Sequence, residues 1–138
     1  QDYTRNQLLE RLCRTQDPTA AEEAVERMEE LGLVDDRSYA MRCARDLVGL
    51  RAFSPRRVEQ ELRRRGVDEE IIEEAVAQFE EDDPCEAIAA FLRRRHPAVL
   101  LGEADERAWR RAVAALQRLG YAYGDIRHVI ENPDEYEE

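Results

Sequence analysis

One helical segment with a defined start and a defined end recurs along this chain, and this recurrence constrains the fold more than any other feature. The stretch Tyr3 to Arg14 is repeated in register by Phe53 to Gly66, with Thr4 aligned to Ser54, and more loosely by Glu106 to Gly120. Few residues are identical between the copies, but their apolar side chains keep helical spacing. The pattern predicts small helical units that stabilise one another by stacking.

Recurring signals mark where helices start and end along the chain. Thr4 with Gln7 three residues later forms a capping box, and Ser54 precedes a proline at the first helical position. Glycines that can adopt the left-handed conformation of a helix end follow three apolar helices, at Gly32, Gly66 and Gly120. We therefore expect three corners of one kind, and in each the next apolar residue should fold back over its helix: Leu33, Val67 and Tyr121.

Apolar residues recur at helical spacing in almost every segment, and no segment alternates like a strand, so an all-α fold is expected. The expected helices are 4–15, 18–31, 36–50, 55–65, 69–81, 84–96, 105–119 and 124–131. Grouped in threes, they predict complete repeats at 35–82 and 83–131. Residues 1–34 hold only the last two helices of a further repeat, so we expect an upstream helix to be missing, and 132–138 form an acidic tail.

Charge and cysteine content narrow the class of protein. Of the 138 residues, 38% are charged, and the net charge of -11 argues against non-specific binding to nucleic acid, in which basic residues neutralise phosphates. No apolar stretch approaches the roughly 20 residues that span a bilayer. The three cysteines are far apart on helical patterns, which argues against a disulfide framework and favours a soluble protein in a reducing cytoplasm: Cys13, Cys43 and Cys85.

Two passages resemble the RecX family of bacterial regulators of the RecA recombinase. Residues Gly32 to Ala40 are similar to the family's Gly-aromatic/Leu-Asp-Asp-x-x-aromatic-Ala signature, and Ser54 to Ala75 combine a Pro-Arg-Arg helix start with a glycine corner and an acidic helix. The resemblance extends to about Asn132 and is weaker over the segment HPAVLLGEA. It implies tandem three-helix repeats in an elongated, curved, right-handed array that lies in the groove of the RecA filament.

The resemblance also implies regulation without catalysis. Proteins of this family hinder filament growth, strand exchange and the filament's promotion of LexA self-cleavage, which links them to DNA recombination, DNA repair and the SOS response. The expected partner is the RecA filament on single-stranded DNA, with possible direct contact to the DNA. We expect a cytoplasmic monomer without cofactor or metal. The family's first helix should precede Asp2, and the acidic tail after Asn132 has no family role.

Arginine clusters are the candidate partner-binding residues, because guanidinium groups form forked hydrogen bonds with carboxylates and phosphates. All basic residues of the chain are arginines. Clusters in last helical turns are equally explained by the helix dipole and by solvation. Arg56 and Arg57 are preferred, because a cation in a first turn opposes the dipole. The full predicted set is Arg56, Arg57, Arg63, Arg64, Arg65, Arg93, Arg94, Arg110 and Arg111.

The remaining polar residues predict no active site. Asp35 and Asp36 at a helix start are interpreted as caps more readily than as a metal or acid–base site. His96 and His128 lack zinc-ligand neighbours and are expected at the surface, whereas Trp109 is expected in the core. Two alternatives stay open: a helical-repeat module that binds DNA directly, and an adaptor that holds a partner helix in a concave groove.

Overall fold

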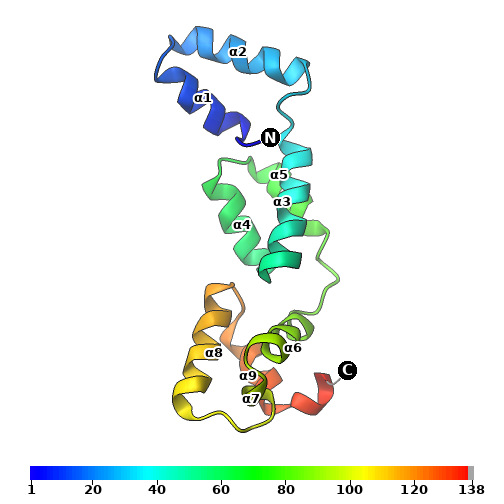
Figure 1. The fold of residues 1–138 in the computed structure, drawn as a ribbon. Coiled ribbons are helices and arrows are strands. Elements are labelled where there is room, and N and C mark those ends of the chain that lie inside the picture. Colours follow the sequence, from blue (N-terminus) through cyan, green and yellow to red (C-terminus); the bar gives the residue numbers. More distant parts are fainter. Residues whose placement is uncertain (137–138) are drawn as a thin grey trace. The chain divides into compact units, whose positions relative to one another are not determined.

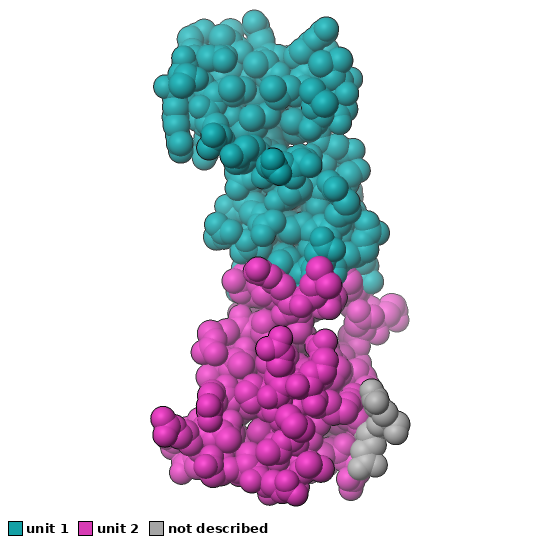
Figure 2. All heavy atoms as spheres, viewed as in Figure 1, with its two compact units in different colours: residues 1–47, 58–78 teal, residues 48–57, 79–138 magenta. Residues whose placement is uncertain are grey.

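The computed structural model describes residues 1–136, and every regular element in that part of the chain is a helix (Figure 1). The predicted all-α class is therefore confirmed. The chain divides into two compact units, which Figure 2 distinguishes by colour. Unit 1 contains residues 1–47 and 58–78, and unit 2 contains residues 48–57 and 79–138. None of the helices within residues 1–136 is long and apolar enough to cross a membrane.

Unit 1 is built from five helices, of which α1 packs against α2 (Figure 1). The helices are α1 (Arg5–Cys13), α2 (Pro18–Glu30), α3 (Asp36–Arg51) as far as residue 47, α4 (Pro55–Arg64) from residue 58, and α5 (Glu69–Ala77). Their apolar faces bury Val25, Leu62 and Ile72 almost completely. The small side chains of Ala40 and Ala44 on α3 are fully buried as well.

Unit 2 contains the end of α3, the start of α4 and the remaining helices. These are α6 (Pro84–Arg95), α7 (Pro97–Leu100), α8 (Glu106–Arg118), α9 (Tyr123–Glu131) and the 3₁₀-helix η1 (Pro133–Tyr136). Its core is formed by apolar residues of α6, α8 and α9, among them the fully buried Ile88, Leu92, Leu116 and Ile126. Trp109 packs against this core, as predicted.

Two differences from the expected helices have local causes. Pro97 cannot continue a helix, so α6 ends at Arg95 and a separate short helix, α7, begins at Pro97. Helix α5 ends at Ala77, short of the expected residue 81. The acidic run Glu80 to Asp83 follows that end, and negative charge there opposes the helix dipole. The short η1 within the acidic tail was not expected. Glu137 and Glu138 at the end of that tail lie outside the described residues.

The three predicted glycine corners are confirmed, with φ of +73° at Gly32, +83° at Gly66 and +97° at Gly120. In each corner the residue after the glycine donates its backbone N–H to a carbonyl in the last turn of the preceding helix. For Tyr121 the acceptor is the carbonyl of Leu116, at 3.1 Å. Val67 and Tyr121 are buried as well, whereas Leu33 stays 64% exposed, so the first corner forms without burying its apolar residue.

In each unit, a residue at the start of one helix donates a hydrogen bond to the carbonyl directly before the corner glycine that follows another helix. In unit 1 the Thr4 hydroxyl donates to the carbonyl of Arg65 at 2.6 Å, directly before Gly66. In unit 2 the Ser54 N–H donates to the carbonyl of Leu119 at 2.9 Å, directly before Gly120. Thr4 and Ser54 both cap their own helices, so the repeated sequence signal that starts a helix also joins two helices.

Candidate partner-binding surface

The predicted arginines of unit 1 at the end of α4 are all bound to acidic residues of the same unit. Arg63 forms a two-pronged contact with Glu69, at 2.5 and 3.1 Å. Arg64 and Arg65 share Glu61, whose Oε1 lies 2.6 Å from Arg64 Nη2 and 2.9 Å from Arg65 Nε. Forked contacts of this kind fix the side chains, so in the free protein these guanidinium groups are largely occupied.

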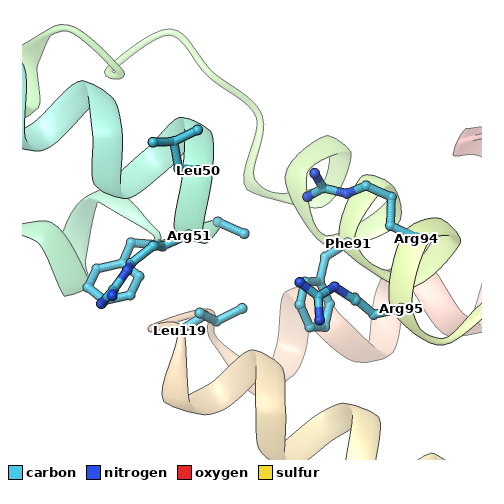
Figure 3. Close-up of a pocket in the computed structure, with 8 residues that line it drawn as sticks. Leu50, Arg51, Phe91, Arg94, Arg95 and Leu119 are labelled. Atoms are coloured by element: carbon cyan, nitrogen blue, oxygen red, sulfur yellow. The ribbon is translucent and has the colours of Figure 1, made fainter.

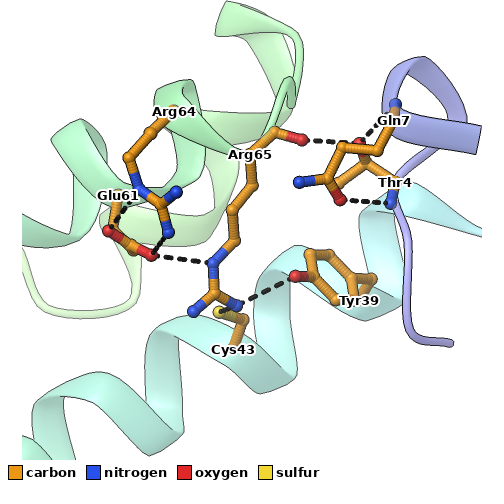
Figure 4. A network of polar contacts seen from close by, with 7 residues as sticks. All are labelled: Thr4, Gln7, Tyr39, Cys43, Glu61, Arg64 and Arg65. Atoms are coloured by element: carbon orange, nitrogen blue, oxygen red, sulfur yellow. Dashed lines mark hydrogen bonds and ion pairs between the residues drawn. The ribbon is translucent and has the colours of Figure 1, made fainter. Parts of the chain in front are cut away.

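Arg65 also joins three elements of unit 1 (Figure 4). Its Nη1 donates to the Tyr39 hydroxyl at 2.9 Å and to the Cys43 Sγ at 3.1 Å, both on α3, while its carbonyl accepts from Thr4. Hydrogen bonds from Arg64, together with those from Arg65, lower the pKa of Glu61 to about 2. Burial raises the pKa of Cys43, so its thiol is not activated. Arg65 therefore has a structural role whatever else it contacts.

Arg56 and Arg57 lie in the first turn of α4, as expected, but their surroundings differ. Arg56 is exposed, and its side chain makes no hydrogen bond or ion pair with any residue in 1–136. Arg57 is half-buried, and its guanidinium lies 4.6 Å from the centre of the Phe53 ring, a cation–π contact. Its backbone N–H donates to the Ser54 hydroxyl at 3.1 Å. Of these two arginines, only Arg56 is thus fully available to a partner among the described residues.

The predicted arginines of α6 and α8 divide in the same way. Arg93 Nη1 donates to the carbonyl of Tyr136 at 3.2 Å, and Arg110 Nη2 lies 2.6 Å from an oxygen of Glu106. Arg94 and Arg111 are exposed, and within the described chain neither side chain has a hydrogen-bond or ion-pair partner. Arg94 lies in the last turn of α6, where the helix dipole favours a cation, whereas Arg111 lies in the middle of α8 and faces solvent.

Arg94 borders a hollow of about 360 Å³ that lies entirely within unit 2, and we call it the arginine hollow (Figure 3). Leu50 and Arg51, at the end of α3, lie on one side, and Phe91, Arg94 and Arg95 of α6 lie on the other (Figure 3). Leu119, Phe53 and Ala52 complete the lining. None of these lining residues is acidic, so the hollow combines an apolar surface with three guanidinium groups.

A left-handed corner at Ala52 shapes the α3 side of the arginine hollow. Ala52 has a φ of 59°, a conformation that an L-residue adopts at a cost. Two hydrogen bonds hold this corner. The Tyr121 hydroxyl donates to the carbonyl of Ala52 at 3.0 Å, and the Ser54 N–H donates to Leu119. Because Tyr121 is buried, its pKa is raised and its hydroxyl remains a donor.

The arginine hollow includes two arginines that the sequence did not assign to the predicted set, Arg51 and Arg95. Arg95 ends the same run as Arg93 and Arg94, and that run was a usable signal. Arg51 had no such signal, because only the turn at Ala52 and the packing of unit 2 bring α3 to α6. Of the predicted set, only Arg94 lines this hollow, and the roles of the others stay predictions.

The acidic pair at the start of α3 acts as a set of caps, with one correction. Asp35 accepts hydrogen bonds from the Ser38 N–H and hydroxyl, which cap α3 and lower the pKa of Asp35. Asp36 instead accepts the N–H of Arg5 at 3.0 Å and so joins the start of α1 to α3. In residues 1–136 no group of three His, Cys, Asp or Glu side chains is placed to hold a metal ion.

The histidines and cysteines differ in burial and in their surroundings. His128 is exposed, as expected, whereas His96 is half-buried beside the Phe91 ring, with centroids 5.7 Å apart. Burial, with Arg111 and Arg95 nearby, lowers the pKa of His96, so its ring is neutral at neutral pH. Cys13, Cys43 and Cys85 are free thiols.

Comparisons with known proteins agree with this architecture. A family model described as RecX, second three-helix domain, matches residues 35–76. A regulatory protein RecX of Trichlorobacter lovleyi is 37% identical over 112 residues, which cover 80% of this chain and 73% of that protein. One from Streptomyces coelicolor is 33% identical over 135 residues, covering 97% of this chain and 71% of the relative.

A solved structure gives the same fold. The crystal structure of RecX from Lactobacillus salivarius matches with a TM-score of 0.74 at 21% identity, over 98% of this chain and 88% of that one. The tandem helical fold is therefore shared with a known structure. Because regulatory proteins RecX are 33–37% identical to it over more than two thirds of their length, and a RecX family model also matches, the chain belongs to the RecX family of regulatory proteins.

Proposed function

We propose that this chain binds the RecA filament on single-stranded DNA and restrains its recombinase, ATPase and LexA-coprotease activities. Membership in a family of regulatory proteins carries the proposal. Regulation by binding is also consistent with the side chains, because several of the described acids act as helix caps or ion-pair partners. The protein would thus act in the cytoplasm, as a monomer, in DNA repair and the SOS response.

The three-helix repeats predicted at 35–82 and 83–131, with a partial repeat at 1–34, remain part of this proposal. Stacked repeats can offer contacts to several filament subunits at once, and linked contacts combine through a high effective concentration. Weak individual contacts by exposed arginines such as Arg56, Arg94 and Arg111 would then add to useful affinity.

A direct test measures RecA activity on single-stranded DNA with and without this chain. We expect the chain to sediment with preformed RecA filaments and to lower both ATP hydrolysis and LexA cleavage as its concentration rises. Chain that stays in the supernatant, with both rates unchanged at saturating concentration, would refute the proposal. A reaction without RecA serves as the control for sedimentation by DNA alone.

Direct DNA binding is a second candidate, favoured by the exposed side chains of Arg56, Arg94 and Arg111, which have no hydrogen-bond or ion-pair partner among residues 1–136. Binding of this kind weakens steeply with salt, because each phosphate contact releases counterions. The net charge of -11 opposes it. Titration of labelled oligothymidylate at low and physiological salt separates the two candidates, since only direct binding gives affinity without RecA.

A further inference from the structure

We propose that the arginine hollow of unit 2 binds a short acidic peptide segment of a partner protein, anchored by one or two apolar side chains. This inference deepens the proposed function, because it names the chemistry by which the regulator would hold its protein partner. The hollow lies within one unit and its lining combines two kinds of surface, and each kind restricts the occupant.

The charged part of the lining selects an anion. Arg51 ends α3, while Arg94 and Arg95 end α6, and none of the three side chains has a hydrogen-bond or ion-pair partner among residues 1–136. The helix dipole accommodates a cation in a last turn without a partner, which explains why these arginines tolerate being unpaired in the free protein. Guanidinium groups contributed by two helices can form forked hydrogen bonds with neighbouring carboxylates.

The apolar part of the lining selects a side chain. Leu50 is 82% exposed, and Leu119, Phe53 and Phe91 are only partly buried beside it. A volume of about 360 Å³ is at the small end of ligand pockets and suits one or two side chains. Covering Leu50 and Phe91 with an apolar anchor would remove exposed apolar surface from water, the main source of favourable free energy in such contacts.

Charge balance favours a peptide over a nucleic acid. Unit 2 has more acidic than basic residues, and the whole chain carries a net charge of -11. A nucleic-acid strand extends its phosphates well beyond one hollow, so the net charge of -11 of the chain opposes its binding more than that of a short segment. A short acidic segment places its charge only where the three arginines lie.

The test is fluorescence anisotropy with a labelled synthetic peptide in which Leu-Phe is flanked on both sides by glutamates. We expect it to bind the wild-type chain, and a matched peptide with Ser-Ser in place of Leu-Phe to bind at least about tenfold more weakly. The double variant R94Q/R95Q should weaken binding by about tenfold or more, because hydrogen bonds to charged groups are lost. Leu50→Ser should reduce the affinity without unfolding the protein, since Leu50 is exposed.

Arg127→Gln is the matched control, because Arg127 is an exposed arginine of the same unit, on α9, paired with Glu131 and outside the hollow. It should leave peptide affinity unchanged. Equal binding of the two peptides, equal loss in Arg127→Gln and R94Q/R95Q, or binding of labelled oligothymidylate in preference to the acidic peptide would each overturn the inference.

Filament sedimentation with the same variants distinguishes failure of this inference from failure of the proposed function. If the wild-type chain and the variants R94Q/R95Q and Leu50→Ser sediment equally with RecA filaments, the proposed function stands and the hollow plays no part in filament binding. Wild-type chain that does not sediment would refute the proposed function, while the peptide titration would still report on the hollow.

Discussion

At the scale of single residues, Glu61 is the acid on which the end of α4 depends. It is 8% exposed and binds both Arg64 and Arg65, and Arg65 in turn reaches Tyr39 and Cys43 on α3. A carboxylate held in this way cannot be protonated without releasing two guanidinium groups. Arg64 is mostly exposed and can return to water, whereas Arg65 is largely enclosed and cannot do so easily.

The low pKa of Glu61 therefore predicts an acid-sensitive fold. Its folded pKa is about 2 against an ordinary value of 4.5, so the stabilisation is fully present above pH 4.5 and is lost as the pH falls toward 2. Glu61→Gln should cost about 1–3 kcal/mol at neutral pH and remove this part of the pH dependence. Urea unfolding of both proteins across that range measures the effect. If the difference in unfolding free energy between the two proteins does not shrink on acidification, the prediction is wrong.

Gly120 supports a second prediction at this scale. A Cβ at this position would lie 2.7 Å from Arg57 Cβ and would also clash with the Ser54 hydroxyl, in addition to the strained φ of +97°. Gly102 in the same unit also has a positive φ, of +72°, but a Cβ there meets nothing within 4 Å. Gly102→Ala should cost about 1–2 kcal/mol from backbone strain alone. Gly120→Ala should cost about 1–3 kcal/mol more from overpacking.

Thermal and urea unfolding of the two glycine variants provide the measurement, and each serves as the control for the other. Equal destabilisation would mean that the corner after α8 has room to move away from the start of α4. In that case the contact between Ser54 and Gly120 would not join these helices as described.

At the scale of elements, the residue that caps one helix start also connects two helices. Thr4 is completely buried although it stands at the start of a helix near the beginning of the chain. Its hydroxyl accepts from the Gln7 N–H at 3.2 Å and donates to the carbonyl of Arg65 at 2.6 Å. One hydroxyl therefore caps α1 and also binds the end of α4.

Thr4→Val tests this double role, because valine keeps a similar shape and removes both hydrogen bonds. We expect a loss of about 1–3 kcal/mol, the sum of a lost cap and an unpaired carbonyl. Thr15→Val is the control: Thr15 is exposed and makes one long bond of 3.4 Å to Leu12, so its loss should stay within about 0.5 kcal/mol. Chemical denaturation of the two variants compares them, and similar losses would argue against the bond between α1 and α4.

Elements of this chain could be predicted well where local chemistry decides them. The capping box at Thr4, the cap at Ser54 and the three glycine corners all form as the sequence indicates. The left-handed corner at Ala52 could not be predicted, because alanine gives no signal for it. Its conformation depends on Tyr121, far away in sequence, whose hydroxyl binds the Ala52 carbonyl.

At the scale of the whole molecule, the candidate surface was less predictable than the fold. Runs of arginine indicate where positive charge lies along the chain, but they do not show which charges are already bound. Arg63, Arg64 and Arg110 are paired with acids of their own or a neighbouring helix, whereas Arg94 and Arg56 are free of such partners in the described residues. Pairing depends on side-chain geometry, and Arg51 joins the hollow only through tertiary packing.

Arg56 and Arg57 allow binding to be separated from stability in the intact chain. Because the chain has a net charge of -11, we expect association with a nucleoprotein filament to depend on such local positive groups. Arg56→Ala should weaken filament sedimentation and change the free energy of unfolding by less than about 0.5 kcal/mol. Arg57→Ala should weaken filament sedimentation too, but cost about 0.5–1 kcal/mol of stability because the Arg57 guanidinium covers the Phe53 ring.

The binding defect of Arg56→Ala should shrink when salt is raised to about 0.5 M, since exposed charges are then screened. An Arg56→Ala chain that sediments as the wild type does at low salt would show that the first turn of α4 is not part of the contact.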